Sequence, residues 1–75
     1  MDILVFGQLT DITGTRNLRL TGIPDTSALV MELNRKFPAL KDACYIMAVD
    51  KTIITENAVI EENSIIALMP PFSGG

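Results

Sequence analysis

The sequence predicts a single α+β domain in which one helix covers one face of a mixed β-sheet. Three observations support this fold class: the chain has 75 residues, 48% of them are hydrophobic, and short strand-like segments flank one helical segment. A chain of this length has room for one core only, and its apolar fraction is too high for a disordered protein. Burying this much apolar surface is simplest when a single helix packs on a sheet.

The first part of the chain predicts a hairpin with a long loop. Residues 3–9 are rich in strand-forming side chains and are too few for a stable helix. Residues 10–16 have the composition of a turn, and residues 17–21 alternate polar and apolar side chains. Two neighbouring strands are therefore expected before any helix.

A helix is expected after the segment Pro-Asp-Thr-Ser at residues 24–27. A carboxylate or hydroxyl at this point can accept a hydrogen bond from an unpaired N–H of the first turn. Pro38 ends the helix, because the residue before a proline is pushed out of the helical region. The apolar stripe of this helix consists of Leu29, Val30, Leu33 and Phe37.

The second half predicts three strands, at residues 45–49, 52–55 and 65–69, with a turn at residues 50–51. Asn63, in the turn before the last strand, is expected to adopt a positive φ. The complete order is strand, strand, helix, strand, short strand, strand. This order predicts a β-grasp, or ubiquitin-like, fold.

The predicted boundaries give a β-grasp domain over residues 1–69 and an extended tail over residues 70–75. Side chains alternate between the two faces of a strand. The side chains expected to face the helix are Ile3, Val5, Leu9, Ile66 and Leu68. The side chains expected on the outer face, as an apolar strip beside the tail, are Leu4, Phe6, Ile65, Ala67 and Met69.

Composition excludes several functional classes. The chain has no histidine and one cysteine, so neither a Cys/His zinc site nor a Ser-His or Cys-His pair can be built. We therefore expect no metal and no catalysis by this chain alone. Cys44 cannot form an internal disulfide, and its apolar neighbours predict a small buried residue rather than a functional thiol.

Charge and hydropathy narrow the expected partners. The net charge is −3 and the six basic residues are scattered, which disfavours nucleic-acid binding. No apolar run approaches the roughly 20 residues of a membrane span. We expect a cytoplasmic protein that docks on other proteins, without a membrane or nucleic-acid partner.

The last six residues have a composition suited to a working tail. The two prolines fix φ and favour an extended course, and six residues can span up to about 20 Å. Glycines have no side chains, so a narrow channel in a partner can admit them. The terminal carboxylate can then attack ATP, and sulfur can displace the resulting adenylate. The residues of this tail are Pro70, Pro71, Phe72, Ser73, Gly74 and Gly75.

The segments Val-Phe-Gly-Gln-Leu at residues 5–9 and Ala-Leu-Met-Pro-Pro-Phe-Ser-Gly-Gly at residues 67–75 carry a resemblance. They are similar to the small subunits of molybdopterin synthases, which are ubiquitin-like sulfur carriers. The resemblance covers the whole chain in length and element order. Two departures are Asn-Ser-Ile-Ile at residues 63–66, where relatives commonly have Gly-Asp-Glu-Val, and Phe72, where valine is usual.

The resemblance implies a mechanism that depends on partners. A ubiquitin-activator-like enzyme would use ATP to adenylate Gly75, and a sulfurtransferase system would convert the adenylate to a thiocarboxylate. The carrier would then insert its tail into the large synthase subunit and give sulfur to cyclic pyranopterin monophosphate. The family's partner-facing hydrophobic residues correspond to Phe6, Ile53 and Met69. No cofactor would be bound by this chain itself.

Other functions remain open at this point. The chain could carry sulfur for thiamine or another thiolated product, although the thiamine-pathway carriers usually lack the two prolines. It could also be a ubiquitin-like modifier joined to lysines through Gly75, or an interaction module whose tail has no role. No acid–base constellation favours an independent enzyme.

Overall fold

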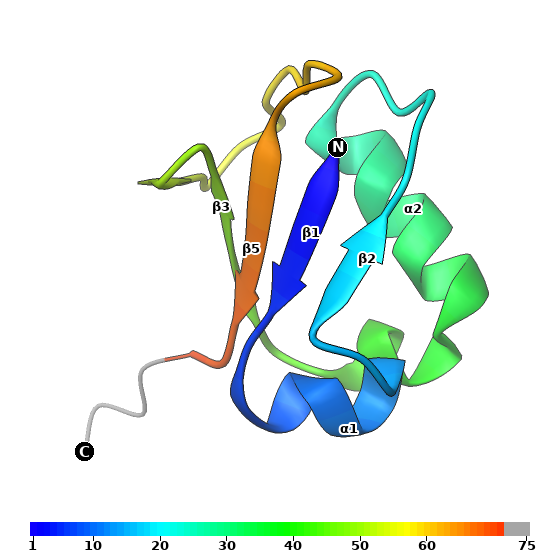
Figure 1. Ribbon diagram of the computed structural model, residues 1–75. Helices are drawn as coiled ribbons and strands as arrows, with labels where there is room; N and C mark the ends of the chain where they lie inside the picture. Colours follow the sequence, from blue (N-terminus) through cyan, green and yellow to red (C-terminus); the bar gives the residue numbers. More distant parts are fainter. Residues whose placement is uncertain (72–75) are drawn as a thin grey trace.

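The computed structural model describes residues 1–71 and shows a five-stranded mixed sheet packed against one long helix (Figure 1). The sheet order is β2-β1-β5-β3-β4; β1 and β5 are parallel, and the other neighbours are antiparallel. The predicted α+β, β-grasp arrangement is confirmed. The strands are β1 (Asp2–Val5), β2 (Asn17–Arg19), β3 (Ile46–Val49), β4 (Thr52–Ile53) and β5 (Ile65–Met69).

The helix α2 (Thr26–Lys36) begins where its capping chemistry predicts. The Asp25 carboxylate accepts a hydrogen bond from the Ala28 N–H at 2.9 Å, which satisfies one free donor of the first turn. The Asn57 side chain accepts a second bond, from the Ser27 N–H at 2.8 Å. These two side chains fix the start of α2 against the loop that follows β4.

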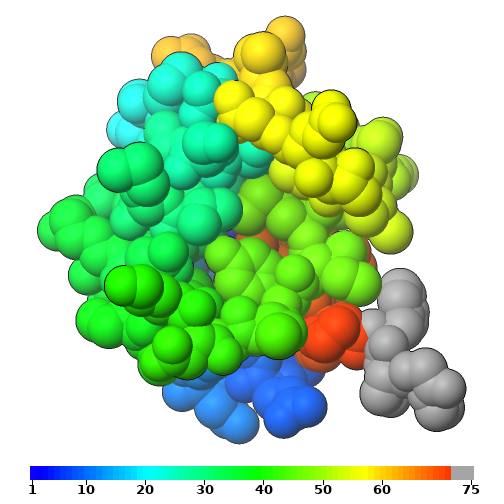
Figure 2. Space-filling model, turned by 180° about the vertical axis from the view of Figure 1, so that it is seen from behind, coloured from blue at the N-terminus to red at the C-terminus, as the bar shows by residue number. Residues whose placement is uncertain are grey.

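The core lies between α2 and the inner face of the sheet. Figure 2, seen from behind, shows α2 in green lying over this side of the molecule. The fully buried side chains come from both layers and have 0 to 1% exposure. They are Ile3, Leu29, Leu33, Leu40, Ile66 and Leu68. Burial of such side chains is the main favourable term for folding, at roughly 1.5 to 3 kcal/mol each.

The first strand is shorter than predicted. β1 ends at Val5, and the chain then forms the 3-10 helix η1 (Gly7–Leu9) and the one-turn helix α1 (Thr10–Thr13). The break occurs because Gly7 adopts a φ of 61°, in the left-handed region that ends an extended strand. The loop expected at residues 10–16 therefore contains a helical turn. A further 3-10 helix, η2 (Pro38–Asp42), follows α2.

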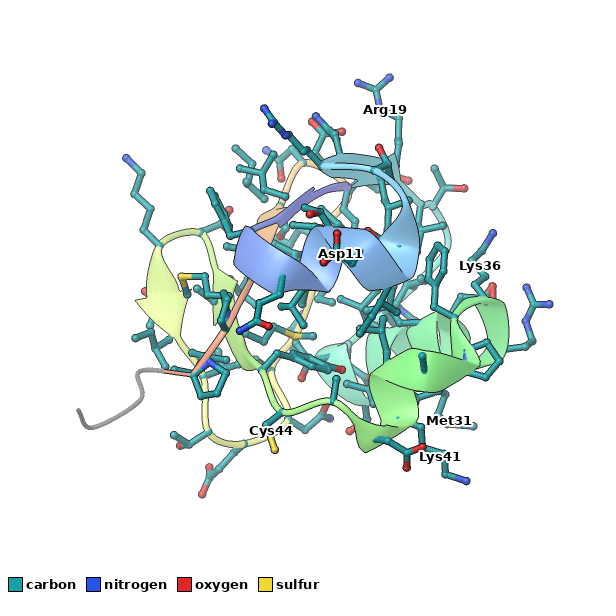
Figure 3. All side chains as sticks on the ribbon, turned by 90° about the horizontal axis from the view of Figure 1, so that it is seen from below. Asp11, Arg19, Met31, Lys36, Lys41 and Cys44 are labelled. Atoms are coloured by element: carbon teal, nitrogen blue, oxygen red, sulfur yellow. The ribbon has the colours of Figure 1, made fainter. Side chains whose placement is uncertain are left out.

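Two predictions about single residues are wrong. Asn63 does not have a positive φ; Ser64 instead closes this turn, accepting from the Glu61 N–H at 2.9 Å through its hydroxyl. Cys44 is exposed, and its sulfur points outward in Figure 3. The connector before β3 is extended, so Ala43 and Tyr45 pack against the core while Cys44 turns to solvent.

β5 has the predicted bounds, and β2, β3 and β4 differ from prediction by one or two residues. β3 begins at Ile46 rather than residue 45, and β4 contains Thr52 and Ile53 only. The positive φ angles between them belong to Asp50 and Lys51, at 49° and 72°. Two successive positive φ angles match the turn that best fits a tight hairpin.

Candidate docking surface and tail

The sheet face opposite α2 carries the predicted apolar strip. Strand pairing places Leu4, Ala67, Ala48 and Ile53 in one row across β1, β5, β3 and β4. Large hydrophobic side chains on this face remain open to solvent, with exposures of 47% for Phe6, 54% for Ile53 and 49% for Ile65. We call this surface the outer strip; it comprises Leu4, Phe6, Ile53, Ile65, Ala67 and Met69.

The three predicted partner-facing residues do not form one tight cluster. Phe6 follows the Val5–Leu68 pair, and its N–H donates to the Leu68 carbonyl at 3.0 Å, so it stands beside Met69. Ile53 lies on the edge strand β4, opposite Ala48. The structure therefore brings Phe6 and Met69 together at the root of the tail and holds Ile53 further along the same face.

The tail leaves the sheet at the end where η1 and α1 lie (Figure 1). Pro70 is half-buried and Pro71 is exposed. The predicted tail residues Phe72, Ser73, Gly74 and Gly75 lie outside the described residues. The strand that carries this tail is hydrogen-bonded on both sides, to β1 and to β3, so its end has a fixed position.

A shallow hollow adjoins Phe6 on the side toward β2. It is lined by side chains and backbone of β1, the segment around Gly7 and the start of β2. Arg16 and Asn17 form its polar side, next to Leu4 and Phe6. The apolar strip thus has a polar and cationic border near the tail, as protein docking surfaces commonly do.

At the opposite end of β1, a surface ion pair borders the strip. Arg19 Nε lies 3.0 Å from the Asp2 carboxylate, and the two residues face each other across β1 and β2. Both side chains are open to water, so the pair contributes little to stability. Asp2 pairs with Ile65 on β5, so the outer strip ends at this charged pair.

Shifted pKa values among residues 1–71 belong to α2 and to the residue before β3. The hydrogen bond from Arg35 lowers the pKa of Glu32 on α2, and burial raises the pKa of Tyr45 before β3.

Residues 1–71 contain no group of three or more metal-ligating side chains. In the same part of the chain, no helix has the length and hydropathy needed to cross a membrane.

Sequence reasoning missed one contact at the tail root. The Pro70 ring packs against Gly7 so closely that a Cβ added at Gly7 would lie 2.6 Å from Pro70 Cγ. The signal in the sequence was the glycine itself, inside a segment that otherwise favours a strand. Ile46 was also missed; it is partly exposed and pairs with Met69 on β5.

Comparison with known sequences gives two matches over almost the whole chain. Residues 3–75 match the ThiS family. A protein of Arabidopsis thaliana described as a molybdopterin synthase sulfur carrier subunit is 31% identical over 78 residues. That match covers 97% of this chain and 80% of the plant protein.

Solved structures with the same fold include two archaeal proteins. The small archaeal modifier protein 1 of Methanosarcina acetivorans superposes with a TM-score of 0.83 at 21% identity, covering 99% of this chain and 94% of its own. The protein of the same name from Haloferax volcanii gives 0.75 at 19% identity, covering 99% and 97%. At these identities the likeness establishes the fold.

Proposed function

The chain belongs to the ThiS family, and on this premise we propose that it is the sulfur-carrying subunit of a molybdopterin synthase. The observation that carries the proposal is the 31% identity to a molybdopterin synthase sulfur carrier subunit over 97% of this chain. The outer strip beside a tail with two prolines and two terminal glycines supports the same function. It supplies a docking surface at the root of the tail that carries the reacting group.

The proposed activation occurs at the carboxylate of Gly75. A carboxylate oxygen attacks the α-phosphorus of ATP, pyrophosphate leaves, and an acyl-adenylate forms. A sulfide-level nucleophile from a sulfurtransferase system then displaces AMP and leaves a thiocarboxylate. An adenylating partner related to ubiquitin activators supplies the ATP site, and no cofactor is bound by this chain.

The proposed transfer takes place in a complex with a large synthase subunit. The outer strip docks on that subunit, with Phe6, Ile53 and Met69 as the central contacts, while residues 70–75 enter its active site. Sulfur passes to cyclic pyranopterin monophosphate, and water returns an oxygen to the carrier's carboxylate. In this scheme the carrier is a sulfur donor, and the large subunit provides the catalytic side chains.

The test is the intact mass of the protein after incubation with an adenylating enzyme of this family, ATP and a sulfur source. We expect replacement of one oxygen by sulfur, located at Gly75 by fragmentation. A matched variant with one extra residue after Gly75 should fold normally and gain no sulfur. Normal sulfur gain in the extended variant would overturn the mechanism.

The sulfur acceptor is tested separately. The thiocarboxylate form is mixed with a large synthase subunit and cyclic pyranopterin monophosphate, or with thiamine-pathway enzymes and their precursor. We expect sulfur transfer in the first mixture. Transfer only in the second would assign the chain to thiamine synthesis, and isopeptide bonds from Gly75 to lysines would assign it to protein modification.

A further inference from the structure

Gly7 and Pro70 meet at the point where the tail leaves the sheet. A Cβ at position 7 would lie 2.6 Å from Pro70 Cγ and 3.3 Å from Pro70 Cδ. The optimal separation of two non-bonded carbons is about 3.5 to 4 Å. The ring of Pro70 therefore occupies the space that any side chain at position 7 would need. Figure 2 shows the red residues at the end of β5 lying beside the blue segment that contains Gly7.

The backbone around Gly7 is held on both sides of the contact. Before it, the Phe6 N–H donates to the Leu68 carbonyl at 3.0 Å, which extends the β1–β5 ladder by one bond. After it, the Thr10 hydroxyl donates to the Gly7 carbonyl at 2.8 Å. The surface against which Pro70 packs is thus fixed by the sheet and by the first residue of α1 together.

Pro70 is equally constrained from its own side. It follows Met69, which pairs with Ile46 in the ladder between β5 and β3, and its ring locks φ near −65°. With φ fixed by the ring and the ring held against Gly7, little freedom remains at the first residue of the tail. Pro71, by contrast, is exposed.

We infer that Gly7 and Pro70 form a brace that sets the direction in which the tail leaves the domain. Both are positioning residues for adenylation of Gly75, and this inference rests on the proposed function. A reactive group that arrives in the right direction reacts faster, because less orientational freedom is lost in reaching the transition state. The brace acts on the reaction step, whereas the outer strip acts on docking.

The first test compares Gly7→Ala with Gly14→Ala. Both glycines have a positive φ, 61° and 74°, so alanine is strained at either position. A Cβ at Gly14 meets nothing within 4 Å, whereas at Gly7 it forces the Pro70 ring to move by about 1 Å. Adenylation is followed as pyrophosphate release at varied carrier concentration. We expect Gly7→Ala to lower kcat by about tenfold or more with little change in KM.

Gly14→Ala should lose thermal stability through its strained φ alone, less than Gly7→Ala, and keep its kcat. An equal loss of kcat in both variants, or a loss in Gly7→Ala that appears in KM instead of kcat, would overturn the positioning role.

The double variant Gly7→Ala/Pro70→Ala tests for rescue, because alanine at position 70 has no Cγ that could collide with the new Cβ at position 7. Pro70→Ala alone should lower kcat by about fivefold. The double variant should be more active than Gly7→Ala; losses that simply multiply would contradict the brace.

A readout independent of activity separates this inference from the proposed function. In NMR spectra of the wild-type chain, we expect nuclear Overhauser effects between the Gly7 α-protons and the Pro70 ring protons. Their absence would overturn the brace whatever the kinetics show. Their presence in a chain that no adenylating enzyme of the family activates would refute the proposed function and, with it, the role of the brace in adenylation.

Discussion

The two faces of the sheet are built from the same strands and the same kinds of side chain, yet they differ in solvent exposure. On β5, Ile66 and Leu68 have 0% exposure, whereas Ile65 on the other face is 49% exposed. The inner face is closed by α2, whose Leu29 and Leu33 are also fully buried. The outer face keeps Phe6, Ile53 and Ile65 open to solvent, although Ala48 on β3 is buried.

This difference separates the residues that make the fold from those available for function. Isolated exposed hydrophobic residues are normal in soluble proteins, but a continuous apolar surface usually marks a docking site. Because side chains alternate between the two faces of a strand, one short strand can contribute both to the core and to the docking surface. Substitutions on one face should therefore change stability, and substitutions on the other should change binding.

The largest effect is expected for Leu68→Ala on the inner face. Removing a fully buried leucine side chain loses its burial energy and leaves a cavity, so we expect a loss of about 3 kcal/mol in unfolding free energy. Urea denaturation measures it. The matched variant Ile65→Ala, on the same strand and the outer face, should lose about 1 kcal/mol. Equal losses would contradict the division between the faces.

The next effect is expected for Phe6→Asp on the outer strip. A buried charge without a partner is unfavourable in an interface, so binding to a large synthase subunit should weaken by about 2 kcal/mol, roughly thirtyfold in Kd. Phe6 is 47% exposed in the free chain, so folding should persist. Calorimetric titration tests this, and an unchanged Kd would remove Phe6 from the docking surface.

A smaller effect is expected for Asp25→Ala at the start of α2. The variant loses the bond to the Ala28 N–H, which should lower unfolding free energy by about 1 kcal/mol. Serine at this position should restore most of the loss, because its hydroxyl accepts the same bond. Kd for the large subunit should be unaffected, and a matching loss of affinity would show that α2 contributes to docking.

The smallest effect is expected for Met31→Glu. Met31 is 73% exposed on α2, more than any residue of the outer strip, and Figure 3 shows it apart from the tail root. It lies on α2, which packs against the inner face of the sheet, and it lines a hollow whose far side holds Ile53, so stability should change by less than about 0.5 kcal/mol and binding at the tail root should not change. A loss of affinity here would mean that exposure alone, rather than membership of the strip, predicts docking.

Alternation and element order were predictable from the sequence because they depend on local pattern. Ile66 and Leu68 were expected inside, and Phe6, Ile65 and Met69 outside, as the structure has them. The start of α2 was predictable for the same reason: Asp25 caps through a bond three residues away.

The features that were missed depend on contacts between distant parts of the chain. Asn57 caps α2 from 30 residues away, and no local pattern marks it. The early end of β1 follows from the positive φ of Gly7 and its packing against Pro70. Cys44 was expected inside because its neighbours are apolar, but alternation in the connector turned it outward. In the tail, residues 72–75 lie outside the described residues, so their predicted role stays a prediction.

The central place of β5 in the sheet has a mechanical consequence. A pull on the tail, as when a partner withdraws it from a narrow channel, acts along a strand bonded to β1 on one side and β3 on the other. Such a load shears two ladders at once instead of peeling one edge strand away. Force applied to the tail is therefore carried by a strand with hydrogen-bonded neighbours on both sides. The domain should resist unfolding when a partner pulls on the tail.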